Sequence, residues 1–173
     1  MHFTNKLHPG QPFAPETFKR LDGADLTFGV PGTWQALFVF RGQHCGACKS
    51  YLRKLQGSLA EFEALGMQIA ALSADSEAQT RITQAACSLT FPLLYGLDMA
   101  ATKRLGFYAS EPASAEETDH RFSEPALLVV NREGVLQVVE LTNVPFLRPD
   151  LDMMLTGFKA MIGKGAPVHG TLR

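Results

Sequence analysis

The chain has 173 residues, enough for one domain that buries a hydrophobic core. Apolar residues make up 46% of it and charged residues 19%, values that are ordinary for a soluble globular protein. The net charge of -1 gives no reason to expect binding to nucleic acid or to an anionic membrane, and no apolar run approaches the roughly 18 residues of a membrane span.

Short apolar runs and helical spacing of apolar residues predict a succession of strands and helices. A hairpin within residues 18–30, turning at Asp22 and Gly23, comes first. The next elements are expected at 34–40 (strand), 48–65 (helix, stopped at Gly66), 67–73 (strand), Asp75 or Ser76 to about Cys87 (helix), 91–95 (strand) and 98–105 (helix). After them come an exposed acidic loop at 109–121, a strand at 126–130, its hairpin partner at 135–141 and a last helix opened by Pro149 and Asp150.

This order, with strand–helix–strand units followed by a hairpin, predicts a sheet that contains both parallel and antiparallel strands. We therefore expect an α/β fold, a thioredoxin-like three-layer α/β/α sandwich with a mixed central sheet and extra N-terminal strands. Residues 1–173 are expected to form a single domain, with flexible ends at 1–13 and 163–173.

A Cys-x-x-Cys pair, Cys45 and Cys48, stands where the strand at 34–40 gives way to the helix at 48–65. Such a junction places the first thiol at the helix N-terminus, where unpaired N–H groups and the helix dipole stabilise a thiolate. A cysteine there can have its pKa lowered from about 8.5 to about 3.5–7.5. We expect Cys45 to attack, because it is nearer the helix start and more exposed, and Cys48 to resolve the mixed disulfide by forming a Cys45–Cys48 disulfide.

Two other interpretations of the pair remain open, a zinc half-site and inert buried thiols. A structural zinc site needs four ligands, and Cys87 and His44 would complete one only if the tertiary structure brought them together. The N-terminus has no apolar signal core, so we expect a cytoplasmic protein, and in a reducing compartment a close cysteine pair is more often catalytic or metal-binding than structural. Cys87 is predicted to pack in the core, with a distant resolving thiol as the alternative.

Two basic residues flank the pair. Arg41 and His44 each offer a positive charge that would lower the pKa of a neighbouring thiol. The alternative for both is an ordinary exposed loop position. No bound cofactor or metal is expected, because in dithiol–disulfide chemistry the electrons reside in the sulfurs.

Several segments resemble the peroxiredoxin-like proteins of the AhpC/TSA group. The opening is similar in Ala14-Pro15-Glu16-Thr17-Phe18, Leu21-Asp22-Gly23 and Leu37-Phe38-Val39-Phe40-Arg41-Gly42, and the late strand–turn–strand in residues 125–135. The likeness covers roughly residues 14–162 and implies a thioredoxin fold and thiol-based redox activity.

The residues that bind and polarise peroxide in that group are missing at the matching positions. Peroxiredoxins carry a proline seven residues and a threonine or serine three residues before the peroxidatic cysteine, where this chain has Phe38 and Gly42. The place of their late-strand arginine holds Pro125, which resembles the cis-proline of thioredoxins, and we expect a cis peptide bond there. Arg121, four residues earlier, is a candidate to replace the lost guanidinium, although an exposed surface position is the simpler interpretation.

These observations favour a thiol–disulfide oxidoreductase that uses the Cys45–Cys48 dithiol to reduce disulfides. The alternatives are a thiol-dependent peroxidase, with Cys45 peroxidatic and Cys48 resolving, and a redox-sensing binding module that docks through the acidic loop. Peroxide reduction is expected to be slow, because each missing preorganised donor can be worth about 10²–10³ in rate. The expected partners are an external thiol reductant of thioredoxin or glutathione type and a disulfide or hydroperoxide substrate. A homodimer is compatible with the sequence.

Overall fold

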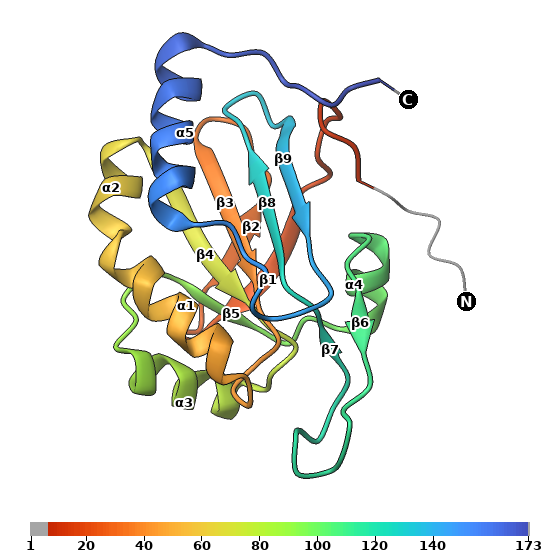
Figure 1. Ribbon diagram of the computed structural model, residues 1–173. Helices are drawn as coiled ribbons and strands as arrows, with labels where there is room; N and C mark the ends of the chain where they lie inside the picture. Colours follow the sequence, from red (N-terminus) through yellow and green to blue (C-terminus); the bar gives the residue numbers. More distant parts are fainter. Residues whose placement is uncertain (1–6, 173) are drawn as a thin grey trace.

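The computed structural model describes residues 7–172, which form a seven-stranded mixed sheet flanked by helices (Figure 1). The strand order is β2-β1-β5-β4-β3-β8-β9. These strands span Asp25–Phe28 (β2), Glu16–Arg20 (β1), Leu93–Tyr95 (β5), Met67–Leu72 (β4), Trp34–Val39 (β3), Ala126–Val130 (β8) and Leu136–Leu141 (β9). The α/β thioredoxin-like fold expected from the sequence is confirmed, including the extra N-terminal strands.

Strands β3, β4 and β5 are parallel, because helices connect them, and the hairpins add antiparallel pairs at both edges. In the centre, β3 is flanked by β4 in parallel and by β8 in antiparallel register, with Val39 opposite both Leu72 and Ala126. This register brings the segment that follows β3 beside the segment that precedes β8, so residues far apart in the sequence meet at one end of the sheet.

Within the described residues, five helices accompany the sheet: α1 (Gly46–Gly57), α2 (Leu59–Ala64), α3 (Glu77–Cys87), α4 (Met99–Arg104) and α5 (Leu151–Lys164). Apolar residues of α1, α2 and α5 form one core with one face of the sheet, and Figure 1 shows these helices together on that face. The opposite face packs against α4 and Phe13. Side chains alternate between the two faces of each strand, so β3 contributes Phe38 to the first core and Leu37 to the second.

The predicted helix 48–65 is wrong in one respect, since the structure divides it into α1 and α2. The break falls at Ser58, whose backbone N–H bonds to the carbonyls of both Lys54 and Leu55. Ser58 Oγ also donates to the Lys54 carbonyl, at 3.3 Å. Consecutive glycine and serine at 57 and 58 are a common cause of such kinks, which the apolar spacing does not record.

Side-chain caps fix the starts of three helices. Ser76 caps α3 in a reciprocal arrangement with Gln79, while Asp98 caps α4 and Asp150 caps α5. The predicted starts at these residues are confirmed, and Gly66, with a φ of 67°, lies just after α2 as expected.

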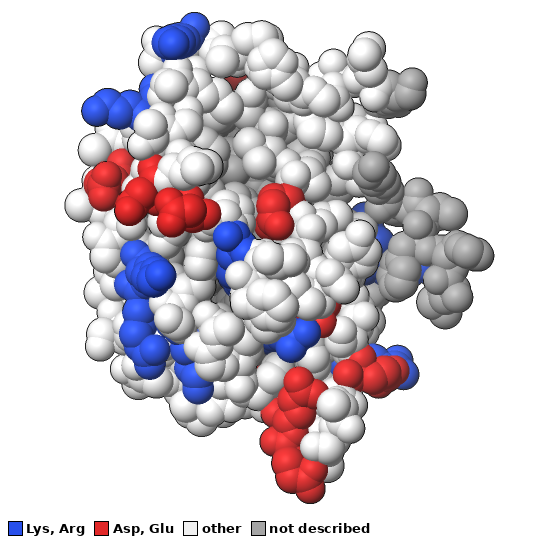
Figure 2. All heavy atoms as spheres, in the orientation of Figure 1, with Lys and Arg blue, Asp and Glu red and all other residues white. Residues whose placement is uncertain are grey.

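The acidic segment 109–121 is exposed as predicted, but it is the tip of a small hairpin. Strands β6 (Ala109–Ser110) and β7 (Phe122–Ser123) pair at its base. The hairpin projects from the body of the protein in Figure 1, and Figure 2 shows acidic side chains gathered on it.

The expectation of a single domain with flexible ends stays a prediction, and residues 1–6 and 173 lie outside the described residues. Within the described part, Phe13 is buried and its N–H bonds to the carbonyl of Gly134. Gly10 bonds in the same way to Leu136. None of the helices described is long and apolar enough to cross a membrane.

Candidate active site

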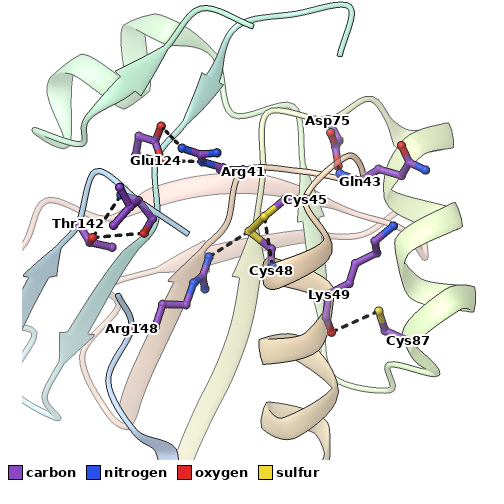
Figure 3. Close-up of a disulfide and its surroundings, with 11 residues drawn as sticks. Arg41, Gln43, Cys45, Cys48, Lys49, Asp75, Cys87, Glu124, Thr142 and Arg148 are labelled. Atoms are coloured by element: carbon purple, nitrogen blue, oxygen red, sulfur yellow. Dashed lines mark hydrogen bonds and ion pairs between the residues drawn. A yellow bond between two sulfur atoms is a disulfide. The ribbon is translucent and has the colours of Figure 1, made fainter. Parts of the chain in front are cut away.

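Cys45 and Cys48 are joined in a disulfide at the end of the sheet where β3 meets α1 (Figure 3). Cys45 is the N-cap of α1, and the backbone N–H of Cys48 donates to its Sγ at 3.2 Å. The sulfur of Cys45 therefore lies at the helix N-terminus, the position for which stabilisation of a thiolate is predicted. The disulfide that the spacing predicted is present, with a Cα–Cα distance of 5.2 Å.

The two sulfurs differ in their access to solvent. Cys45 keeps 7% of its surface exposed, whereas Cys48 is completely buried. Cys45 also lines a hollow of about 390 Å³. Its other walls come from Glu116 and Glu117, between β6 and β7, and from Pro145, between β9 and α5. An incoming molecule can thus contact Cys45 more readily than Cys48, and the order of attack stays a prediction. A larger hollow of about 580 Å³ lies elsewhere and contains neither cysteine.

Arg41 does not face the cysteines as its position in the sequence suggested. Its Nε and Nη2 donate to the two carboxylate oxygens of Glu124, at 2.8 and 2.9 Å. Glu124 is 3% exposed, and Ser110 Oγ donates to the same carboxylate. The guanidinium also lies over the ring of Phe122, 5.3 Å from its centroid. The charge of Arg41 is therefore neutralised by a buried carboxylate, so this residue joins the redox loop to the β7–β8 segment.

His44 lies beside Cys45, with its ring 4.8 Å from that of Phe122. Both ring nitrogens are buried without a hydrogen-bond partner. Burial lowers the pKa of His44 below its ordinary value, so the ring is neutral at pH 7. The expected positive charge at this position is absent at neutral pH.

Gly42 stands where peroxiredoxins carry a threonine or serine, and a steric conflict excludes a side chain at this position. Its φ is 143°, and a Cβ there would collide with Oδ1 of the buried Asp75. Asp75 in turn accepts the N–H of Gln43 at 2.8 Å. The carboxylate therefore fixes the redox loop in a conformation that has no space for threonine or serine.

Two predictions concern the later part of the chain: the one for Pro125 is wrong, and the one for Arg121 finds no support. The expected cis bond at Pro125 is wrong, since none of the peptide bonds between residues 7 and 172 is cis. Here Pro125 continues the β8–β9 ladder, its carbonyl accepting the N–H of Thr142, and the extended backbone is satisfied in the trans form. Arg121 is exposed on the hairpin, where it pairs with Glu111 at 2.7 Å.

Arg148, which the sequence analysis missed, is the arginine that reaches the disulfide. It lies between β9 and α5, and its Nη2 donates to Cys48 Sγ at 3.4 Å (Figure 3). Its Cζ stands 4.9 Å from the centroid of the Tyr51 ring. No signal in the sequence singles out this arginine, because it is 100 residues from its sulfur partner.

Cys87 is buried and free, as the core-packing interpretation predicted. Its Sγ is directed toward α1, 3.7 Å from the carbonyl oxygen of Lys49, and Figure 3 shows it apart from the disulfide. Within residues 7–172, no group of three or more His, Cys, Asp or Glu side chains is arranged to hold a metal ion.

Comparison with known protein families shows which family this chain belongs to. The model of the AhpC/TSA family matches residues 10–139, three quarters of the chain. The chain belongs to the AhpC/TSA family. Compared with curated proteins by sequence, it matches none of them.

Solved structures show the same fold at low sequence identity. A peroxiredoxin-like protein from Aquifex aeolicus is similar over 92% of this chain and 90% of its own, with a TM-score of 0.76 and 14% identity. The peroxidoxin BcpB of Mycobacterium tuberculosis gives 0.73 and 12%, over 90% of this chain and 99% of its own. The AhpC of the same organism gives 0.71 and 19%, over 90% and 98%. Family membership and the disulfide together make this AhpC/TSA protein a thiol-based oxidoreductase.

Proposed function

We propose that this protein is a thiol–disulfide oxidoreductase that reduces disulfides with its Cys45–Cys48 dithiol. The observation that carries the proposal is the pair itself, a disulfide across the first turn of α1 with only Cys45 open to solvent. The Cys45 thiolate attacks a substrate disulfide and forms a mixed disulfide. Cys48 then attacks Cys45 Sγ, which releases the second substrate thiol and leaves the disulfide seen here.

The surroundings of Cys45 support disulfide over peroxide as the substrate. Rapid peroxide cleavage needs donors that are aimed at the departing oxygen. Gly42 supplies no hydroxyl, and Arg41 is engaged by Glu124. The hollow beside Cys45 is open and has a volume of about 390 Å³. An external thiol reductant, of thioredoxin or glutathione type, would regenerate the dithiol.

A thiol peroxidase is the second candidate, and membership of the AhpC/TSA family favours it. In that reaction Cys45 would be oxidised to a sulfenic acid, and Cys48 would condense with it to give the same disulfide and water. Both candidates therefore share the resolving step and differ only in the molecule that oxidises Cys45.

Two assays on the full chain separate the candidates. One measures insulin reduction driven by dithiothreitol, and the other measures oxidation of the reduced protein by hydrogen peroxide in a stopped-flow instrument. We expect the wild type and Cys87→Ser to reduce insulin at equal rates, and Cys45→Ser to have no activity above the uncatalysed rate. Rapid oxidation by peroxide without insulin reduction would assign the protein to the peroxidases.

A further inference from the structure

Arg148 is a positive charge beside the disulfide that no carboxylate neutralises. Within residues 7–172, it forms no ion pair with an aspartate or glutamate. Its Nε is buried without a hydrogen-bond partner, and its Nη2 donates to Cys48 Sγ. Burial lowers the pKa of Arg148 to about 10, so the group is still charged at pH 7.

Within residues 7–172, the other ionisable groups around Arg148 form no ion pair with it, although the charge of Glu140 acts on it and raises its pKa. Tyr51 presents the face of its ring, and burial raises the pKa of its phenol to about 12, so the phenol is neutral. The Tyr51 hydroxyl donates to the carbonyl of Pro149 and is therefore directed away from the guanidinium. Glu140 on β9 is half-buried, and burial raises its pKa, while Glu124 is paired with Arg41. Within residues 7–172, the acceptor that the Arg148 side chain contacts is the sulfur of Cys48.

A partly buried guanidinium is stable only where an anion or an aromatic face compensates its lost hydration. Tyr51 supplies the aromatic face. The disulfide sulfur is a weak acceptor, but in the dithiol the same atom can carry a full negative charge. The contact therefore becomes stronger when the disulfide is opened.

We propose that Arg148 is a catalytic residue that stabilises the thiolate of Cys48, both when Cys48 leaves the disulfide and when it attacks to re-form it. The proposal rests on the dithiol–disulfide function proposed above. It assigns the two positive influences at the site to different sulfurs, the helix N-terminus to Cys45 and the guanidinium to Cys48.

In the reductive direction, an external thiolate attacks Sγ of Cys45, the less buried of the two cysteines. A new sulfur–sulfur bond forms there, and the Cys45–Cys48 bond breaks with its electron pair going to Cys48. The new negative charge lies on Cys48 Sγ, and Arg148 faces that atom and stabilises it. A second external thiol, after losing its proton, attacks the external sulfur of the mixed disulfide and releases Cys45 as a thiolate, so two thiols are oxidised to one disulfide as the protein gains two electrons.

The expected change in the rate of disulfide opening follows from the effect of a nearby opposite charge on the pKa of the Cys48 thiol. Such a charge within about 4–6 Å lowers the pKa of an acidic group by about 1–3 units. A rate sensitivity of about 0.4–0.5 per pKa unit is typical of thiol–disulfide exchange, and the lower-pKa thiol is the better leaving group. Loss of the guanidinium should therefore slow opening of the disulfide about 3- to 20-fold, if the departing thiol has a similar sensitivity.

The first test measures the pKa of the Cys48 thiol directly. In a Cys45→Ser, Cys87→Ser background only Cys48 remains, and its thiolate is followed by absorbance at 240 nm as the pH rises. We expect a pKa below 8.5, and an increase of about 1–3 units on adding Arg148→Gln. Arg132→Gln, which removes an exposed arginine at the opposite end of β8, is the matched control and should leave the pKa unchanged.

The second test measures how fast dithiothreitol opens the disulfide in the full chain, with no protein substrate present. Arg148→Gln should be about 3- to 20-fold slower than the wild type, and Arg148→Lys should recover part of the rate because it keeps the charge. Because this assay needs no turnover of insulin or peroxide, it is independent of which substrate the protein uses. A failure of the insulin assay alone therefore counts against the proposed function and not against the role of Arg148.

An unchanged Cys48 pKa and opening rate in folded Arg148→Gln would overturn the proposal. If that variant does not fold, the titration with Arg148 intact still decides, because a Cys48 pKa at or above 8.5 beside a native guanidinium contradicts it. Circular dichroism of each variant establishes which of the two comparisons applies.

Discussion

Two arginines lie on either side of the disulfide, and their surroundings are opposite. Arg41 is held by both oxygens of a buried carboxylate, whereas Arg148 has an aromatic ring and a sulfur as its neighbours. A paired charge contributes to structure because its field is largely cancelled nearby. An unpaired one remains able to respond when a new charge appears beside it. The difference indicates that proximity to a cysteine in sequence does not identify the arginine that acts on it.

Breaking the Arg41–Glu124 pair should have the largest effect on stability. Glu124→Gln leaves the partly buried guanidinium without its anion, and loss of one partner of a buried pair costs about 3–5 kcal/mol. Arg148→Gln leaves no carboxylate unpaired and removes mainly a cation–π contact, which is worth about 0.5–2 kcal/mol. Urea unfolding of both variants, in the oxidised state, gives the two free energies. Equal losses would contradict the contrast between the arginines.

The redox loop on the Arg41 side should not tolerate a side chain at Gly42. Gly42→Ala combines an unfavourable backbone conformation with a collision against the carboxylate of Asp75, and we expect a loss of more than about 1 kcal/mol. Gly46→Ala is the control, because a Cβ there meets nothing within 4 Å and alanine favours the helix. Thermal unfolding distinguishes them. A Gly42→Ala protein as stable as Gly46→Ala would show that the loop is not held as described.

On the Arg148 side, the contributions of the Tyr51 ring and of its hydroxyl to stability should be separable by substitution. Tyr51→Phe keeps the aromatic face and loses one hydrogen bond to Pro149, worth about 0.5–1.5 kcal/mol. Tyr51→Leu loses both the bond and the cation–π contact, so it should be the less stable of the two. Urea unfolding supplies the comparison, and the Cys48 titration should be shifted only in the leucine variant. Identical titrations would mean that the ring does not position the guanidinium.

His44 should give the smallest effect, a dependence of stability on pH. Because its pKa in the folded protein lies below the ordinary value of 6.5, the neutral ring favours folding. This contribution is fully present above about pH 6.5 and is lost as the pH falls through the folded-state pKa. Melting temperatures at pH 7.5, 6.5 and 5.5 should fall more steeply for wild type than for His44→Phe. Both proteins keep Asp75, so its contribution cancels, and parallel curves would contradict the neutral assignment.

Features that depend only on neighbouring residues could be predicted from the sequence. The apolar run at 34–40, the Cys-x-x-Cys spacing and the helical pattern after it are local, so they placed the disulfide at the start of α1 correctly. The helix starts near Ser76, Asp98 and Asp150 were predicted for the same reason, with Asp75 left open as the alternative to Ser76, since the signals of a helix start act within one turn. The break at Ser58 was missed because apolar spacing continues through it.

The charged groups that surround the sulfurs could not be predicted in this way, because the fold brings them together. Glu124 and Arg41 are 83 residues apart, and Arg148 and Cys48 are 100 apart, so no periodicity connects them. Their meeting depends on the antiparallel pairing of β3 with β8 and on the segment between β9 and α5 returning over α1. Electrostatic interactions act through space and depend on burial, neither of which follows from position along the chain. The chain therefore specifies its redox pair locally, and the fold selects the arginine that faces it.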